Sequence, residues 1–525
     1  MGVATRELAQ VSLAPRVTAA SSLWAQALCL VALVLLAGGL RLYDLDAAAI
    51  WGDEGSSLLL AGFAPADIWA HAGHDVHPPL YFLMLHGWIA LFGDSLMAVR
   101  LFSALPGTAT VLVGLWLMRV IATPRAAWLG ALLLALLPTA VRYSQEVRMY
   151  AWLGLWLLGA TLALVYWVRR PERSRYLAVY ALLMSGAFYT HYFTLFGVLV
   201  HWSYLALLRR QPAPARTLLT RPAWWLANGA IVLLYLPWVP SLIDLLRHVE
   251  ALKVGGDIGW EPAVDLSSLP SMLWQLLAQD DAQGWTWPWL LALPLVVLAL
   301  SVAAWRGDRG PYRFTRLLVL YWALPLLLIH AISLISPLFI ERYLTAFALG
   351  LPLMLALVIE RLARRSRGLA LALLALIVGV EGLGLLNNYT VDPNDQFDTM
   401  VDYVNREFVA GDRIVTGDML WYLSYVYYNR TPARPLLYTP PLADGRSTRP
   451  NDYGFGTLIK DGGRGVYLDS LATLPQGTGR VWLVMSRVDP DEFPVIPPTW
   501  RRMAGQGGGD AQAVLYQICQ PCAGH

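Results

Sequence analysis

The sequence predicts an all-α polytopic membrane domain followed by a small C-terminal α/β domain. Of the 525 residues, 57% are hydrophobic and only 14% are charged, whereas soluble domains average about 25% charged residues. Uncharged stretches long enough to cross a bilayer recur along the chain. After Leu386 the sequence becomes polar and contains many Gly and Pro residues. We therefore expect a cytoplasmic N-terminus (1–21), a transmembrane domain (22–386) and a C-terminal domain outside the cytoplasm (387–525).

The apolar stretches predict about eleven transmembrane helices. The stretch from Tyr176 to Leu208 is too long for one crossing and has arginine clusters at both ends, so we expect it to leave and re-enter the membrane near Thr190 to Phe193. The expected spans lie at 22–40, 101–118, 126–141, 149–168, twice within 176–208, and at 223–243, 285–305, 317–340, 343–359 and 368–386.

The short apolar segment from Pro79 to Gly93 is expected to lie along the outer interface. Counting it as a span would place most later arginine clusters outside, against the positive-inside rule. With it at the interface, the N-terminus lies in the cytoplasm, and the long loops 41–97 and 244–284 lie outside together with the C-terminal domain. In that domain the residue pattern predicts a helix at 397–408 and strands at 413–416 and 480–485.

Two adjacent carboxylates, Asp53 and Glu54, lie in the first outer loop within WGDEGSS, two residues after Trp51. A carboxylate close to a low-dielectric boundary can be tuned to act as a general base, so the pair is a candidate reaction centre. Acidic residues are also favourable at a helix N-terminus, where their role is structural. The dipeptide alone leaves both interpretations open.

The segment HAGHDVHPPLYF (71–82) places histidines and a carboxylate ahead of two prolines that set a rigid start for the next helix. His74 and His77, together with Asp53, are candidate ligands of a divalent metal, although no HExxH or comparable spacing is present. A plain hydrogen-bonded turn is the alternative. Apart from this candidate metal, no cofactor is expected.

Three arginines from different helices are expected to converge on the outer interface: Arg100, Arg148 in RYSQEVRMY and Arg342 in FIERYL. A planar guanidinium suits a phosphate, and a lipid phosphate lies at this depth. Any single arginine could instead snorkel or form a structural ion pair, as Arg142 and Glu146 could at their spacing of four. Together the three are candidate ligands of a donor phosphate. The candidate substrate contacts are His77, Tyr143, Glu146 and Tyr343.

These segments resemble the C-type membrane glycosyltransferases, specifically the protein O-mannosyltransferases and lipid A aminoarabinose transferases (glycosyltransferase family 39 and relatives). The resemblance covers about residues 20 to 390 and rests on WGDEGSS, DVHPPLYF, AVRLFSAL, YSQEVRMYAW and ERYL in that order. It implies inverting transfer from a polyprenyl-phosphate sugar, with Asp53 as base, Glu54 in support, and Arg148 and Arg342 on the phosphate. His77 stands where aminoarabinose transferases carry Lys and mannosyltransferases carry His. The loop 244–284 is too short for the β-rich domain of eukaryotic mannosyltransferases.

The sequence thus predicts a membrane glycosyltransferase of the GT-C fold, a hexosyl- or pentosyltransferase, acting on the outer face of the plasma (inner) membrane in cell envelope glycosylation. Expected partners are the bilayer, a polyprenyl-phosphate-linked sugar, and a lipid, glycan or protein acceptor with a hydroxyl or amine. The net charge of +3 gives no case for nucleic acid.

Two other classes stay open. A transporter or flippase would need polar residues and broken helices near mid-membrane, and a non-catalytic scaffold would only present the C-terminal domain. Cys519 and Cys522 form one Cys-x-x-Cys pair near the chain end, for which a small disulfide loop is favoured over a zinc or redox site.

Overall fold

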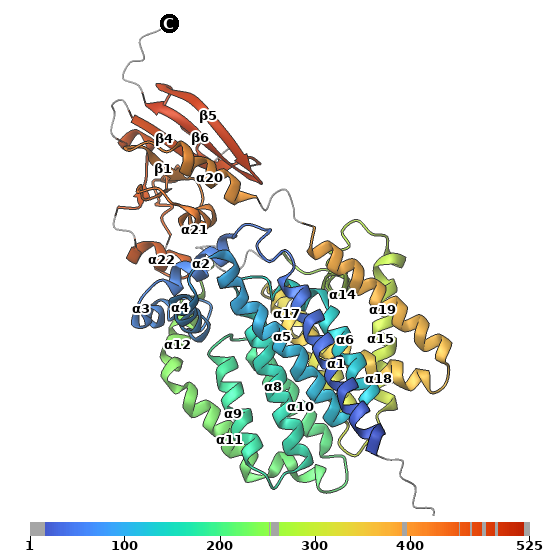
Figure 1. Cartoon of the computed structure of the whole chain (residues 1–525). Helices are drawn as coiled ribbons and strands as arrows, with labels where there is room; N and C mark the ends of the chain where they lie inside the picture. The colour runs from blue at the N-terminus through green and yellow to red at the C-terminus, as the bar shows by residue number, and fades with distance from the viewer. Residues whose placement is uncertain are drawn as a thin grey trace, which may run out of the picture.

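The computed structural model describes residues 16–250, 253, 262–390, 396–450, 452–462, 465–474, 479–488 and 492–518. Figure 1 shows a bundle of helices with a β-sheet unit at one end, reached along the chain after α19 (Arg367–Asn388). The predicted fold class, a helical membrane part with a small C-terminal α/β unit, is therefore confirmed. Cys519 and Cys522 lie outside the described residues.

Seven helices or helix runs in the described part of the chain are long and apolar enough to cross a membrane. α17 (Glu341–Ala348) and α18 (Gly350–Ala363), bent by 43° at their junction, form an eighth candidate. The protein is thus a multi-pass membrane protein. The seven are α1 (Arg16–Leu42), α5 (Leu96–Ile121), α8 (Tyr150–Arg169), the run of α11 (Pro222–Tyr235), η2 (Leu236–Trp238) and α12 (Val239–Arg247), α15 (Trp287–Gly307), α16 (Phe314–Ser333) and α19.

Three shorter apolar helices occupy the other predicted spans: α6 (Pro124–Leu136), α9 (Arg175–Phe188) and α10 (Thr194–Leu208). The expected total of about eleven is reached if these three also cross. The turn between α9 and α10 includes residues 190–193, where the sequence predicts it. α6 is followed by α7 (Pro138–Arg142), because Pro138 lacks the N–H that would continue the helix.

The loop after α1 folds into α2 (Gly52–Ala61), α3 (Pro65–Ala72) and α4 (Leu80–Phe92), which lie between the bundle and the C-terminal unit (Figure 1). α4 coincides with the predicted interfacial helix. Its 13 residues rise about 20 Å, which is short of a hydrocarbon core of about 30 Å. Gly93 ends α4 with a φ of 82°, a conformation that favours glycine.

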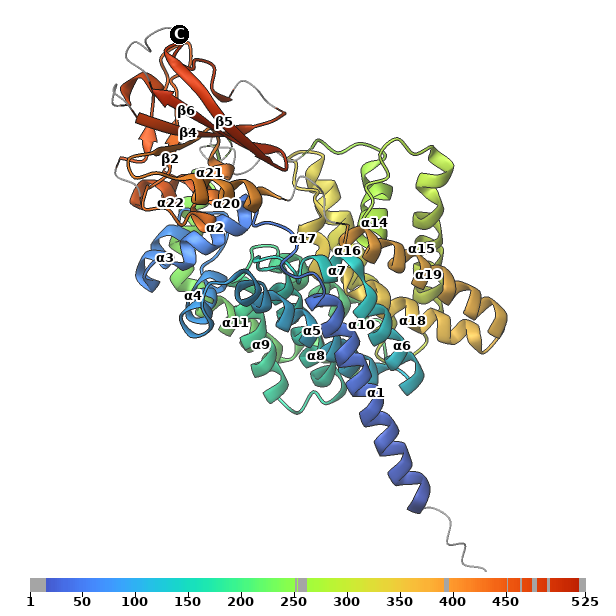
Figure 2. The same cartoon turned by 45° about the horizontal axis from the view of Figure 1, so that its top comes forward.

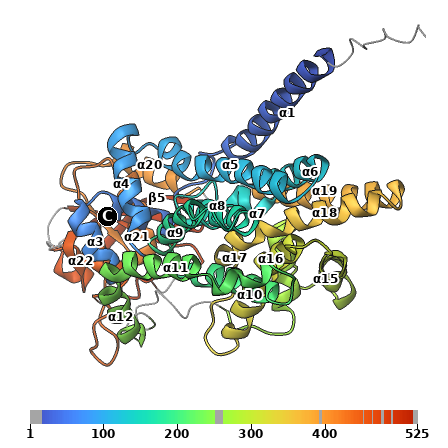
Figure 3. The same cartoon turned by 90° about the horizontal axis from the view of Figure 1, so that it is seen from below.

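The centre of the bundle is formed by α8, seen nearly end-on in Figure 3. Of its apolar window 72% is buried inside the protein, against 11% for α1, which protrudes from the bundle on the side away from the sheet (Figure 2). The start of α8 packs in one apolar cluster with residues of α2, α4 and α5, among them Leu58, Phe82, Phe102 and Tyr150. This cluster fixes the short helices on the end of the bundle.

The C-terminal unit is one six-stranded sheet in the order β3-β2-β1-β4-β6-β5. The first four strands in this order are parallel to one another, and β6 runs antiparallel to both of its neighbours, β4 and β5. The helix predicted at 397–408 and the two predicted strands are present as α20, β1 and β4. The elements are α20 (Phe397–Glu407), β1 (Arg413–Thr416), α21 (Met419–Tyr428), β2 (Leu436–Tyr438), α22 (Phe455–Gly462), β3 (Tyr467–Leu468), η4 (Leu471–Thr473), β4 (Gly479–Ser486), β5 (Trp500–Gly508) and β6 (Ala511–Ile518).

Two further helices lie in loops of the membrane part, η1 (Ala215–Thr220) and α14 (Ser268–Ala278). α14 falls in the long loop 244–284, for which the sequence analysis predicts no helix. Its apolar residues Leu273, Leu276 and Leu277 are buried in the main core of the bundle. Gln279, the residue that ends α14, has a positive φ of 52° and lies beside the candidate site described below.

Candidate active site

The adjacent carboxylates of WGDEGSS occupy the first turn of α2, where the helix dipole favours negative charge. Both are buried: Glu54 is fully inaccessible and Asp53 is 8% exposed. Successive residues of a helix point about 100° apart, so the two side chains meet different partners. This difference separates their roles.

Glu54 forms a bidentate ion pair with Arg100 of α5. Glu54 Oε2 lies 2.8 Å from Arg100 Nη2, and Oε1 lies 3.1 Å from Nε and accepts a 2.7 Å hydrogen bond from the Val147 N–H. The other N–H groups of Arg100 donate to the carbonyls of Leu45, Ala48 and Ala49. All five guanidinium donors are engaged, which leaves none for a phosphate. The contacts therefore give Arg100 a structural role in place of the predicted phosphate contact.

Asp53 meets the other two predicted arginines. Its Oδ2 lies 3.1 Å from Arg342 Nη1 and 3.7 Å from Arg148 Nη2. The Arg342 guanidinium also lies over the rings of Trp51 and Tyr343, with Cζ at 5.6 and 6.0 Å from the ring centroids, as in cation–π contacts. One carboxylate thus lies between two guanidinium groups that come from different parts of the bundle.

Arg148 joins α2 to the HPP segment. Its Nη1 donates to the Asp53 carbonyl at 3.0 Å and to Ser57 Oγ at 3.1 Å, and its Nη2 lies 3.4 Å from His77 Nε2. Ser57 is a residue that the sequence analysis does not identify. Its position four residues after Asp53 on one helix is the signal that could have indicated it, because such residues share a face.

His77 is a buried side chain. Burial, and then the neighbouring Arg148 cation, hold the pKa of His77 well below its usual value. Its Nδ1 lies 3.7 Å from Asp75 Oδ1, and burial raises the pKa of Asp75 to about 6. A neutral ring can accept from Arg148 at Nε2 while its Nδ1–H faces Asp75. His77 therefore links Asp75 to the cation that contacts Asp53.

His191, in the turn between α9 and α10, belongs to the same group of side chains. Its ring lies 5.5 Å from that of His77 and 5.8 Å from that of Tyr343, centroid to centroid. Burial lowers the pKa of His191 as well. The sequence pattern predicts the turn but not this contact, because nothing local indicates that the turn packs against the first loop.

The candidate metal ligands are not brought together. His74 is half-exposed and pairs with Asp244 at 3.9 Å, while its Nδ1 lies 3.1 Å from the Ala70 carbonyl. Across the described ranges, no group of three or more His, Cys, Asp or Glu side chains is placed to hold a metal ion. The prediction of a metal site formed by Asp53, His74 and His77 is therefore wrong, because His74 turns toward α12.

Two of the predicted substrate contacts lie in the loop before α8. Glu146 Oε1 lies 3.7 Å from Arg142 Nε, the pair that their spacing predicts. Burial raises the pKa of Glu146 to about 7. The Tyr143 hydroxyl donates to Glu341 at 3.3 Å, and Glu341 also accepts a hydrogen bond from Gln279. Gln279, the residue that ends α14, thus connects the loop 244–284 to the site. The sequence pattern predicts neither this helix nor this contact.

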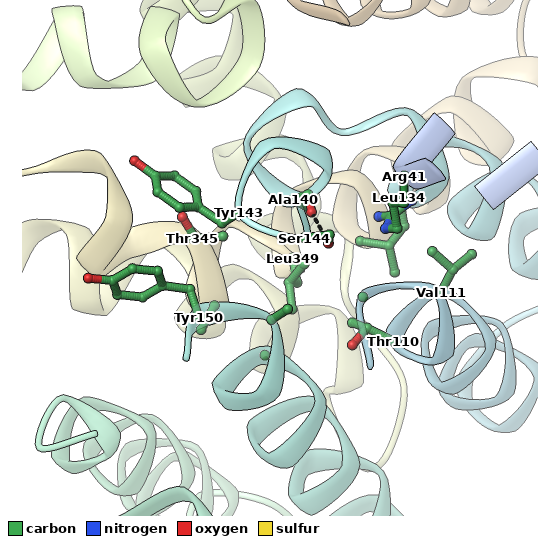
Figure 4. A pocket seen from close by; sticks show the side chains of 14 residues that line it. Arg41, Thr110, Val111, Leu134, Ala140, Tyr143, Ser144, Tyr150, Thr345 and Leu349 are labelled. Atoms are coloured by element: carbon green, nitrogen blue, oxygen red, sulfur yellow. Dashed lines mark hydrogen bonds between the residues drawn. The ribbon is translucent and has the colours of Figure 1, made fainter. Parts of the chain in front are cut away.

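Two cavities border these side chains. The smaller is about 20 Å³ and has Tyr143 and Tyr150 on one wall and Arg41 on the other (Figure 4), with the Ser144 hydroxyl donating to the Ala140 carbonyl between them. This volume holds about one water molecule. It is too small for a sugar.

The larger cavity is about 560 Å³ and lies beside Arg342, Trp51 and Glu146. Its wall combines carboxylates, amides and aromatic hydroxyls, a mixture suited to a polyhydroxylated ligand. Asp53 does not line this cavity itself; its ion-pair partner Arg342 does. The other polar lining residues are Asp44, Glu54, Arg100, Arg142, Tyr143, Gln145, Asn387, Asn388, Tyr389 and Thr390.

The site is thus a buried carboxylate between two arginines, at one end of a multi-pass helical bundle and beside the C-terminal α/β unit. Residues 76–240 match the family model of the dolichyl-phosphate-mannose-protein mannosyltransferases. That range holds the HPP segment and Arg100 and Arg148 but neither Asp53 nor Arg342.

Solved structures share the fold. ArnT from Cupriavidus metallidurans in the apo state has a TM-score of 0.64 and 15% sequence identity, covering 96% of this chain and 100% of that chain. ArnT bound to undecaprenyl phosphate has a TM-score of 0.60 and 14% identity, covering 94% and 99%. The archaeal oligosaccharyltransferase AglB from Archaeoglobus fulgidus, in complex with an inhibitory peptide and a dolichol-phosphate, has a TM-score of 0.50 and 12% identity, covering 95% and 75%.

A search of curated proteins found no match. The family match and the common fold nevertheless agree with each other, and they confirm the resemblance that the motifs predict. The protein has the fold of the C-type membrane glycosyltransferases.

Proposed function

We propose that the protein is a glycosyltransferase that transfers a sugar, with inversion, from a polyprenyl-phosphate donor to a hydroxyl or amine of an acceptor. The observation that carries this proposal is the position of Asp53, whose carboxylate lies 3.1 Å from Arg342 and 3.7 Å from Arg148. A carboxylate can take the acceptor proton, and the two guanidinium groups can bind the phosphate that leaves.

The donor class is supported by the shared fold. Two of the matched structures hold a polyprenyl phosphate: undecaprenyl phosphate in ArnT and dolichol-phosphate in AglB. Arg342 is the better phosphate ligand in this chain, because it borders the larger cavity and is 15% exposed, while Arg148 is 4% exposed and already contacts Ser57 and His77. We assign Arg342 the first contact with the phosphate and Arg148 the support of Asp53.

The donor, the acceptor, Asp53 and the arginines are sufficient for the proposed transfer. The acceptor oxygen or nitrogen attacks the anomeric carbon of the donor, and its proton passes to Asp53. The bond between the anomeric carbon and the phosphate oxygen breaks, and its electron pair stays on the phosphate, where arginines stabilise the charge. Attack from the face opposite the leaving group inverts the anomeric centre.

The larger cavity is the proposed place of the transferred sugar. Its volume of about 560 Å³ falls within the range of small-molecule sites, and Trp51 and Tyr143 offer ring surfaces beside carboxylates and amides. Whether the sugar is a hexose or a pentose depends on this lining. We place the site on the outer face of the plasma membrane, because the arginine clusters of the short loops then face the cytoplasm.

Substitution of Asp53 by Asn tests the proposal. In purified protein supplied with a radiolabelled polyprenyl-phosphate sugar and a membrane extract as acceptor, we expect the variant to fold and insert normally and to lose transfer by about a hundredfold or more. Asp67→Asn is the matched control, since Asp67 is an exposed acid on α3 in the same loop. Equal transfer by Asp53→Asn and the native protein would overturn the proposal and favour a scaffold.

A further inference from the structure

The helix that carries Asp53 is covered by a helix of the C-terminal unit. Figures 1 and 2 both show α2 directly beside α21, although more than 350 residues separate them in the chain. The N–H of Ile50, just before α2, donates to the Tyr428 hydroxyl at 2.7 Å. The C-terminal unit therefore touches the first loop at the start of the helix that bears the reactive carboxylate.

The contact between the two helices passes through two glycines. A Cβ atom on Gly55 would lie 2.6 Å from the Leu423 carbonyl oxygen, 2.7 Å from its carbon and 3.0 Å from the Ser424 nitrogen, all backbone atoms of α21. A Cβ on Gly52 would lie 2.8 and 2.9 Å from the Leu420 side chain. Such distances leave no room for any other residue unless one helix moves.

Backbone dihedral angles do not require these glycines, because both lie inside α2 and neither has a positive φ. Glycine is less favourable than alanine inside a helix, because it loses more backbone conformational freedom on folding. Two glycines in a ten-residue helix are thus unfavourable locally, and their spacing of three puts them on one face. Close packing against α21 is the physical reason for their presence.

Other contacts hold the C-terminal unit on the same surface. The Tyr427 hydroxyl donates to the Asp94 carbonyl at 3.0 Å, and the Gly454 N–H donates to the His74 carbonyl at 2.8 Å. The Tyr453 ring stacks on His248 with centroids 4.3 Å apart. The unit therefore also contacts the segments that follow α3, α4 and α12, so it can fix α2 relative to the bundle.

We propose that α21 is a positioning element of the reaction centre: through Gly52 and Gly55 it presses α2 onto the bundle and sets the distance of Asp53 from Arg148 and Arg342. This inference rests on the proposed function. Displacement of a reacting group by about 1 Å can slow catalysis up to a hundredfold, so an alanine in this contact affects turnover without touching a substrate.

A size exchange tests the contact. Gly52→Ala should lower kcat about tenfold and leave the KM for the polyprenyl-phosphate sugar near the native value, because Arg342 is untouched. Leu420→Gly removes the two side-chain atoms that lie within 3.0 Å of the new methyl group and leaves, of the three nearest atoms, only the Leu420 Cα, at 3.3 Å, so the double variant Gly52→Ala/Leu420→Gly should recover most of the lost kcat. Gly87→Ala on α4 is the matched control, since no atom lies within 4 Å of a Cβ there. We expect it to keep native kcat.

Hydrogen exchange of the peptide 51–61 in the intact protein gives a readout that needs no activity. We expect faster exchange in Gly52→Ala and return toward native exchange in the double variant. Native exchange in Gly52→Ala, or faster exchange with unchanged kcat, would overturn the positioning role. Absence of transfer in the native protein would count against the proposed function, while the exchange data would still decide whether α21 holds α2.

Discussion

Asp53 and Glu54 are adjacent in the sequence, but their side chains have entirely different neighbours in the fold. Glu54 faces α5 and makes a bidentate pair with Arg100 in a fully buried place. Asp53 faces two arginines and reaches the edge of the protein interior, with its side chain 12% exposed. Only the second carboxylate combines cationic partners with partial access, so stability and turnover should depend on different members of the pair.

Replacing Glu54 by Gln should lower the free energy of unfolding of the protein. The change leaves the buried Arg100 cation without its counter-charge, and breaking a buried ion pair costs about 3–5 kcal/mol. We expect the thermal midpoint of unfolding of the detergent-purified variant to fall clearly. Fluorescence-detected gel filtration after heating measures this midpoint. Glu172→Gln, at an exposed pair 3.9 Å long, should change the free energy of unfolding by less than about 1 kcal/mol. Similar midpoints for both variants would contradict a structural role of Glu54.

Glu146 should make stability depend on pH. Burial raises its pKa from 4.5 in the unfolded chain to about 7 in the folded protein. The folded state then holds this proton more tightly, so the stabilisation is complete below about pH 4.5 and is lost as the pH rises through 7. Over this window the loss is about 3 kcal/mol.

Asp75 also has a raised pKa and contributes to the pH dependence of stability. Comparing the native protein with Glu146→Gln separates the contribution of Glu146 from that of Asp75. The thermal midpoint of the native protein should fall more steeply between pH 5 and pH 8 than that of the variant. Parallel midpoint curves would show that Glu146 keeps an ordinary pKa.

At the scale of elements, the sequence identifies what depends on local composition. Apolar length predicts the long helices, the proline pair and short apolar run predict α4, and short runs rich in β-branched and other apolar residues predict β1 and β4. Topology then places Arg100, Arg148 and Arg342 at the same end of the bundle. Each of these features can be predicted from the residues next to it in the sequence.

The partners of those side chains depend on how each helix is rotated, which composition does not determine. Arg100 therefore looks like a phosphate ligand in the sequence, although its five donors are engaged by Glu54 and three carbonyls. His191 and Gln279 reach the site from turns whose packing involves segments far away in the chain. Gly52 and Gly55 also look like ordinary small residues until α21 is in place.

At the scale of the molecule, one end of the bundle carries everything that the proposed chemistry needs. α2 with Asp53, the larger cavity and the C-terminal unit all lie there, while α1 extends toward the opposite end (Figure 2). The C-terminal unit and the reaction centre must therefore lie on the same side of the membrane. Locating one of them locates the other.

Cysteine accessibility can determine that side. In a background with Cys29, Cys519 and Cys522 replaced by Ser, Ser447→Cys places a thiol on an exposed loop of the C-terminal unit, and Ser174→Cys places one in the arginine-rich loop between α8 and α9. Positive loops stay in the cytoplasm. A membrane-impermeant maleimide should thus label position 447 in intact cells and position 174 only after the cells are permeabilised.

The reverse labelling pattern would place Asp53 on the cytoplasmic side and would contradict the proposed outer-face reaction. Labelling of both positions in intact cells would indicate leaky cells, which is checked with a cytoplasmic marker protein that carries one exposed cysteine. Because the two thiols lie at opposite ends of the same bundle, an odd number of crossings must separate them. The experiment therefore also tests whether the helices between the two positions, from α9 to α19, make an odd number of complete crossings.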